Sequence, residues 1–113
     1  MRPQLKELIG KRVHFIGIGG AGMSGLARIA LSHGITVSGS DAKDSSVVIA
    51  LSALGATVST SHAAENVDGS DLVVYSNAIS QSNPERVRAQ ELNLPILTRA
   101  AALAMLMSES KSV

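Results

Sequence analysis

The chain has 113 residues, with ten Lys and Arg against nine Asp and Glu and no cysteine. Its length fits one domain with a single core, and the lack of cysteine excludes disulfides, thiolate catalysis and zinc–thiolate sites. A net charge of +1, no basic run longer than two residues and only one Phe and one Tyr give no indication of nucleic-acid binding.

The chain also lacks the sequence features of secretion and membrane insertion. Its N-terminal stretch MRPQLKELIGKR has no apolar core like that of a signal peptide. No apolar run approaches the length of a membrane span. We therefore expect a soluble domain of the cytoplasm that contacts neither a membrane nor a nucleic acid.

Apolar periodicity predicts an alternation of strands and helices along the chain. Five strands are predicted over residues 12–16, 35–39, 56–59, 71–76 and 94–98. Helices are predicted over residues 22–33, 44–54, 82–92 and 99–108, with a helical turn over 3–9, a polar loop of at most one helical turn over 60–70 and a frayed tail from 108. Gly34 and Gly55 are expected to end the first two of these helices, and Asn83 and Pro84 to begin the third.

Strands that alternate with helices favour a parallel sheet. We expect an α/β, Rossmann-like, doubly wound fold with five parallel strands in the order 3-2-1-4-5, in a single domain over residues 1–113. Ligands of such sheets bind beyond the carboxyl ends of the strands at the switch point, here between the first and fourth strands. The loops expected to form a site are therefore residues 17–24, 39–44, 59–63 and 76–83.

A glycine-rich loop stands between the first strand and the first helix. Gly17, Gly19 and Gly22 fit the pattern G-x-G-x-x-G, in which glycines allow a tight turn, close approach of a diphosphate and close packing of the helix. The helix N-terminus adds free N–H groups and a partial positive charge, Gly20 adds room and Ser24 offers a hydroxyl. The loop therefore predicts phosphate binding, and the alternative is a glycine-rich turn without a ligand.

Polar residues follow two further strands at the same edge of the predicted sheet. Asp41 comes nineteen residues after Gly22 (41 − 22), where an acidic residue accepts from a ribose hydroxyl, and Ser40 stands beside it. The alternative is a loop carboxylate or a cap of the helix that begins near Asp44. Residues 76–79 are small or carry an amide and can hydrogen-bond a ligand, although ordinary turn chemistry explains them equally well.

The other charged candidates are three histidines and one arginine. His14, His33 and His62 do not form a metal-ligand cluster in the sequence. The first is expected to pack within its strand and the second to end a helix. The third is expected to be a plain surface residue at the rim of the crevice, where it could also contact a base. Arg99 follows the last strand, where it can neutralise a phosphate, and the alternative is a surface residue at an unfavourable helix start.

Residues for chemistry on a bound nucleotide are not evident. The sequence has no nucleophile–base pair, no paired carboxylates and no second phosphate loop of the form G-x-x-x-x-G-K-[ST]. We therefore expect a domain that holds a nucleotide without a catalytic residue, a cofactor or a metal site of its own.

Several of these stretches together resemble a known family. HFIGIGGAGMSGLA followed by VSGSD, SNAI and NPE, with a last strand and the Arg99 helix, resembles the N-terminal domain of the Mur ligases over residues 12–108. The resemblance is to the branch that adds L-alanine to UDP-N-acetylmuramate in peptidoglycan precursor synthesis. It implies a first domain that binds the UDP part of that substrate. ATP, magnesium and the ligation chemistry would belong to central and C-terminal domains that this chain lacks.

The resemblance also implies roles for individual residues. The diphosphate would be held by Ile18, Gly19, Gly20, Ala21, Gly22, Met23 and Ser24. Ser40 and Asp41 would face the uridine, and His62 would lie near the uracil and ribose. The diphosphate and sugar side would be lined by Ser76, Asn77, Ala78, Ile79 and Arg99.

Two other interpretations stay open. The generic G-x-G-x-x-G pattern and Asp41 also fit an NAD(P)-binding module of a dehydrogenase or of a channel's regulatory domain. A structural remnant without a ligand is the third interpretation. The GGAGMSG continuation of the loop and the SNAI stretch favour the ligase family.

Overall fold

The computed structural model describes residues 8–42 and 45–110. Its strands are β1 (Arg12–Ile16), β2 (Thr36–Ser40), β3 (Thr57–Ser59), β4 (Leu72–Tyr75) and β5 (Ile96–Thr98). Its helices are α2 (Ala21–Ser32), α3 (Ser46–Ala53), the 3₁₀ turn η1 (Ala64–Val67), α4 (Pro84–Glu91) and α5 (Arg99–Ser110). The helical turn expected over residues 3–9 lies mostly outside the described residues, and so do the last three residues of the tail.

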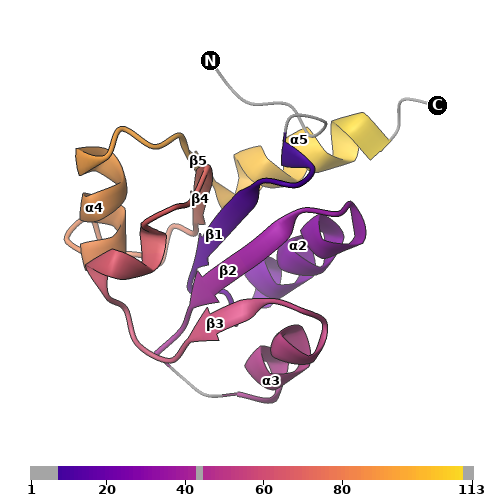
Figure 1. Cartoon of the computed structure of the whole chain (residues 1–113), viewed down its shortest axis with the longest axis horizontal. Coiled ribbons are helices and arrows are strands. Elements are labelled where there is room, and N and C mark those ends of the chain that lie inside the picture. The colour runs from indigo at the N-terminus through magenta and orange to yellow at the C-terminus, as the bar shows by residue number, and fades with distance from the viewer. Residues whose placement is uncertain (1–7, 43–44, 111–113) are drawn as a thin grey trace.

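The five strands form one parallel sheet in the order β3-β2-β1-β4-β5, which confirms the predicted topology. In the central strand β1, Val13 lies opposite Val37 of β2 on one side and Leu72 of β4 on the other. After β3 the chain crosses the sheet and starts its second half beside β1 (Figure 1). The switch point therefore falls between β1 and β4, and the loops after all five strands meet at one edge.

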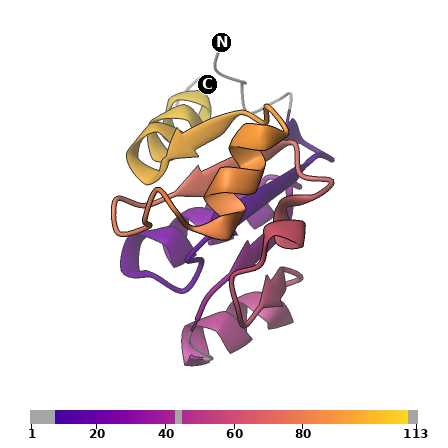
Figure 2. The same cartoon turned by 90° about the vertical axis from the view of Figure 1, so that its left-hand side faces the viewer.

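Helices cover both faces of the sheet. α2, α3 and α5 lie on one face, and α4 packs with η1 on the other (Figure 1). Figure 2 views the molecule from the side of α4 and η1, which lie in front of the strands. Along β1, Val13 and Phe15 belong to the core under the first group, and Ile16 belongs to the core under the second. Burial on both faces explains the nearly continuous apolar run of this strand.

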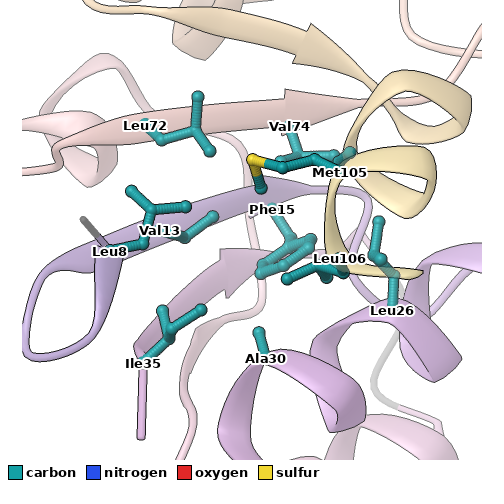
Figure 3. A pocket seen from close by; sticks show the side chains of 11 residues that line it. Leu8, Val13, Phe15, Leu26, Ala30, Ile35, Leu72, Val74, Met105 and Leu106 are labelled. Atoms are coloured by element: carbon teal, nitrogen blue, oxygen red, sulfur yellow. The ribbon is translucent and has the colours of Figure 1, made fainter. Parts of the chain in front are cut away.

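The larger core lies between the sheet and the helices α2 and α5. Figure 3 shows Phe15 of β1, Leu26 of α2 and Met105 of α5 around the same small space. The cavity between them has a volume of about 10 Å³ and is lined by apolar residues alone. A void of this size and lining offers no hydrogen-bond partner to a water or a polar ligand. This half of the molecule is a packed support for the loops.

The predicted helix ends are largely confirmed. Gly34 and Gly55 follow α2 and α3 with φ of +78° and +112°, values that glycine adopts without strain. Asn83 begins α4, with its side chain accepting from the N–H of Glu85 at 2.9 Å, and Pro84 is the first helical residue. η1 is the single helical turn expected in the polar loop over residues 60–70.

Most element boundaries differ from the predictions by one or two residues, and three of these differences have a clear physical reason. α3 begins at Ser46, two residues later than expected, because Ser45 caps it by accepting a backbone N–H at 3.3 Å. α5 continues to Ser110, into the tail that was expected to fray, because the Ala- and Leu-rich run before it has high helix propensity. β2 ends one residue later than expected, so Ser40 is a strand residue whose side chain points to one face of the sheet.

Within residues 8–42 and 45–110, no helix is both long enough and apolar enough to cross a membrane.

Candidate functional site

The glycine-rich loop lies against the end of β2. The N–H groups of Gly17 and Ile18 donate to the carbonyl of Ser40 at 2.8 and 3.0 Å, and Gly20 closes the turn by donating to the carbonyl of Gly17 at 3.0 Å. Gly17 has a φ of +77°, so a side chain at this position would be strained. The loop is therefore a tight turn that aims the start of α2 at the carboxyl edge of the sheet.

The N-terminus of α2 carries no side-chain cap. Gly20 is its N-cap residue and has no side chain to cap the helix, and the first turn has no acidic residue. A helix without such a cap presents backbone N–H groups and a partial positive charge to whatever approaches it. This arrangement suits an anion such as a phosphate.

Arg99 lies against this helix end. A Cβ added to Gly22 would stand 2.7 Å from Cδ of Arg99 and 2.9 Å from one of its terminal nitrogens. The missing side chain of Gly22 therefore makes room for the arginine, where the pattern had predicted packing of the helix on a strand. The fold brings a guanidinium to the positive end of α2, and two like charges placed together favour a bound anion.

Residues after β4 complete this part of the edge. A hollow of about 250 Å³ is lined by Asn77, Thr98, Arg99 and Ala100. Ile79 lies over the start of the glycine loop, because a Cβ on Gly17 would stand 3.3 Å from its Cδ1. The structure thus brings together the glycine loop, the residues that follow β4 and the first residue of α5, as the topology had predicted.

Asp41 contacts the glycine loop directly. Its Oδ2 accepts from the N–H of Gly19 at 2.8 Å, and its own N–H donates to the carbonyl of Ser59 at 3.0 Å. A Cβ on Gly19 would stand 2.7 Å from the same Oδ2 and 3.1 Å from Cγ2 of Val48. Gly19 is therefore needed to admit the carboxylate of Asp41. The expected contact of Asp41 with a ribose stays a prediction, and its alternative as the cap of α3 is wrong because Ser45 caps that helix.

Glu85, the second residue of α4, was not singled out from the sequence, although its side chain is fully buried. Its Oε1 lies 2.6 Å from Nε2 of His14 and accepts from Oγ of Ser40 at 2.7 Å. Its Oε2 accepts from the N–H of Ala63 at 3.0 Å and from Nδ2 of Asn66 at 2.9 Å. Four donors thus occupy the two oxygens, which is about the full capacity of a carboxylate.

These contacts keep Glu85 ionised. Burial by itself would raise the pKa of its carboxyl, but the hydrogen bonds from His14, Ser40 and Asn66 outweigh it and lower the pKa from 4.5 to about 2. A buried charge that is fully hydrogen-bonded is tolerated, whereas one that has lost a partner is costly. Glu85 therefore holds together strands, a loop and η1 that lie far apart in the sequence.

The hydrogen-bond network continues from His14 through Ser38 to Arg12, the first residue of β1. Nδ1 of His14 lies 2.8 Å from Oγ of Ser38, which accepts from Nε of Arg12 at 3.0 Å. His14 is only 1% exposed, so the expectation of a packed histidine is confirmed. His33 directly follows α2 as its C-cap residue, as expected.

His62 lies at the outer end of this network. Its Nδ1 is 2.9 Å from Oγ of Ser40 and 3.5 Å from Oε2 of Glu85, and its side chain is 24% exposed. The interpretation of His62 as a plain surface histidine is therefore wrong.

No sequence pattern distinguished Glu85, because an acidic residue after Asn83 and Pro84 is already explained by the start of a helix.

The topology and the residues at its switch point define a Rossmann-like α/β domain with a glycine loop, an uncapped helix and an arginine at one edge. The model of the Mur ligase family, catalytic domain, matches residues 12–111, and the chain belongs to this family.

The chain is similar to several named ligases. The chain is 59% identical over 96 residues to UDP-N-acetylmuramate–L-alanine ligase of Thermobifida fusca, covering 85% of this chain and 20% of the relative. A solved UDP-N-acetylmuramate-alanine ligase from Thermotoga maritima superposes with a TM-score of 0.85 at 35% identity, over 89% of this chain and 24% of that one. A UDP-N-acetylmuramate:L-alanyl-gamma-D-glutamyl-meso-diaminopimelate ligase from Neisseria meningitides gives 0.77 at 35% identity, over 83% and 30%. The chain thus spans about a fifth of the length of the curated relatives that it matches.

Proposed function

We propose that this domain binds the UDP part of UDP-N-acetylmuramate and serves as the substrate domain of a ligase that joins L-alanine to it. The names of the relatives support the substrate, since both the Thermobifida and the Thermotoga proteins are UDP-N-acetylmuramate–alanine ligases. The observation that carries the proposal is the contact between Arg99 and Gly22 at the uncapped N-terminus of α2. This pairing supplies the positive charge that a diphosphate needs.

The arrangement of the edge suggests how such a ligand would lie. In our proposal the diphosphate sits on residues 18–24 beside Arg99, and the sugar extends towards residues 76–79 and the hollow beside them. The uridine lies towards Ser40, Asp41 and His62, on the other side of the glycine loop. This direction follows from the sheet, because β2 and β3 lie on one side of β1 and β4 on the other.

A titration that compares two ligands tests this proposal. We expect UDP-N-acetylmuramate to shift the backbone amide signals of residues 17–24, 40–41, 76–79 and Arg99 together, because these residues meet at one switch point. Amides near Gly55 serve as the internal control, because this residue lies between α3 and the amino end of β3, away from the carboxyl ends of the strands. The affinity should be modest if other domains supply further contacts to the sugar.

The same titration with NADH separates the competing interpretations. If NADH shifts the glycine-loop amides at a lower concentration than the UDP-sugar does, the domain is a dinucleotide-binding module and our proposal is wrong. If neither compound shifts them, the domain is a structural unit without a nucleotide ligand.

The glycine loop does not fit the triphosphate chemistry of a ligase. Phosphoryl transfer uses a loop whose lysine reaches the terminal phosphates and whose hydroxyl holds a magnesium ion. Here Gly22 is followed by Met23 and Ser24, so no lysine is supplied. Residues 8–42 and 45–110 contain no group of three or more acidic or histidine side chains placed to hold a metal ion. We therefore assign ATP and magnesium to other parts of the full-length ligase.

This assignment predicts that the 113-residue chain alone shows no alanine-dependent ATP hydrolysis, with or without magnesium. The measurement is phosphate release in the presence of UDP-N-acetylmuramate and L-alanine, with a full-length relative as the positive control. Robust turnover by the isolated chain would contradict both the assignment and the proposed division of labour.

A further inference from the structure

The hydrogen bonds of Glu85 fix which atoms around it donate. An ionised carboxylate only accepts, so the single proton of Ser40 Oγ points at Oε1 of Glu85, 2.7 Å away. The same oxygen of Ser40 lies 2.9 Å from Nδ1 of His62. Because its proton is already used, Ser40 can only accept in this second contact. His62 is therefore assigned the tautomer that carries its proton on Nδ1.

The remaining contacts of Glu85 disfavour the other tautomer of His62, which would carry its proton on Nε2. Oε2 lies 3.5 Å from Nδ1 of His62, where a proton is attracted by the carboxylate. The same oxygen accepts from the backbone N–H of Ala63, which is a donor that cannot turn around. The carboxylate of Glu85 is therefore held in place, and its negative charge favours a proton on Nδ1 of His62.

The far nitrogen of His62 is consequently an acceptor. In a neutral imidazole with its proton on Nδ1, Nε2 carries a lone pair and points away from Nδ1. None of the described residues pairs with Nε2, and the ring is partly exposed. His62 follows β3 at the carboxyl edge of the sheet, and its ring contacts Ser40 at the end of β2. An acceptor thus stands at the part of the edge that we assign to the uridine.

We propose that Glu85 is a positioning residue that, through Ser40, makes Nε2 of His62 an acceptor for the imide N–H of the bound base and so selects uridine over cytidine nucleotides. The inference rests on the proposed binding of a UDP-sugar. Uracil carries a hydrogen-bond donor at N3, whereas cytosine carries an acceptor there. An acceptor on the protein pairs with the first and leaves two lone pairs facing each other with the second.

Measuring the tautomer of His62 tests the first half of this inference without any ligand. We expect the ¹⁵N chemical shifts of its ring, recorded above the pH range in which histidine ordinarily titrates, to show a protonated Nδ1. In Glu85→Gln the amide oxygen must face the N–H of Ala63, so its NH₂ group faces Ser40. The Ser40 proton then turns towards His62, and the ring proton moves to Nε2. Glu91→Gln, an exposed change on the same helix, should leave the tautomer unchanged.

Binding of UDP and CDP tests the second half. The wild-type chain should prefer UDP by about tenfold or more, which corresponds to one hydrogen bond gained or left unmade. The preference should fall towards one or reverse in Glu85→Gln and persist in Glu91→Gln. His62→Ala keeps the carboxylate and removes only the partly exposed ring, so it should also lose the preference even if Glu85→Gln fails to fold.

The outcomes separate this inference from the proposed function. If UDP does not shift the glycine-loop amides, both proposals fail. If UDP shifts them but the wild-type chain binds CDP equally well, or His62 carries its proton on Nε2, the role of Glu85 and His62 is refuted and UDP binding stands. An equal loss of UDP and CDP affinity in His62→Ala would indicate a ribose contact and would also refute selection of the base.

Discussion

Replacing Glu85 by alanine is expected to lower the free energy of unfolding by about 3–5 kcal/mol, the range observed when one partner of a buried charged pair is removed. The change would leave His14, Ser40, Asn66 and the N–H of Ala63 without their acceptor, and His14 and Ser40 are buried away from water. Urea denaturation followed by circular dichroism measures the effect. For a domain of this size, such a loss is a large share of the total stability.

Glu91→Ala is the matched control. Glu91 lies on the same helix, but its side chain is 62% exposed and its ion pair with Arg88 is 3.8 Å long. Removing it should change the free energy of unfolding by less than about 0.5 kcal/mol. Equal effects of the two substitutions would mean that the hydrogen bonds of Glu85 contribute nothing to the stability of the fold.

Glu85 should also make the fold sensitive to acid. Its pKa is about 2 in the folded chain against an ordinary value of 4.5, so its contribution to stability is fully present above pH 4.5 and is lost as the pH falls towards 2. The difference corresponds to roughly 3 kcal/mol. Denaturation midpoints of the wild-type chain should therefore decline over this range. Those of Glu85→Ala should decline less, because the group that takes up the proton is missing.

Replacing Gly19 by valine is expected to weaken UDP-N-acetylmuramate binding by at least about tenfold and to lower stability by about 1–3 kcal/mol. The Cβ alone would stand 2.7 Å from Oδ2 of Asp41 and 3.1 Å from Cγ2 of Val48. Asp41 must then give up its hydrogen bond to the N–H of Gly19, and the loop must shift. Amide-shift titrations and urea denaturation measure the two effects separately.

Gly25→Ala tests whether any added carbon on this segment has the same consequence. Gly25 lies within α2, and a Cβ there would meet nothing within 4 Å. Because alanine is the better helix former, stability should rise by up to about 1 kcal/mol and binding should be retained. Unchanged affinity in a folded Gly19→Val would place the nucleotide away from the glycine loop.

Much of the fold could be predicted because it depends on residues that are near one another in the sequence. The glycine ends of α2 and α3, the Asn83 cap and the alternation of strands with helices all rest on turn chemistry or periodicity within a few residues. The one-residue shift of β2 could not be predicted. It depends on the pairing of Ser40 with Ser59 and Ile16 on neighbouring strands.

The candidate site was predicted only in its location. That the loops after β1, β2, β4 and β5 meet at one edge follows from the parallel order of the strands. The order of the strands did not predict which side chains lie against the glycines. Arg99 packs against Gly22 and Asp41 against Gly19, and both residues belong to other parts of the chain. A glycine pattern indicates that another group packs closely against the backbone, but it does not identify that group.

The sequence by itself determined a parallel α/β domain with a glycine loop at its switch point, because strand and helix periods and turn residues act locally. Only the tertiary structure decided that Glu85 is a buried anion. Its partners His14 and Ser40 lie 71 and 45 residues away in the sequence, and the charge is tolerated only when both are present. The same long-range contacts turn His62 from a surface residue into the outer end of a hydrogen-bonded network, since a tautomer depends on neighbours that the fold supplies.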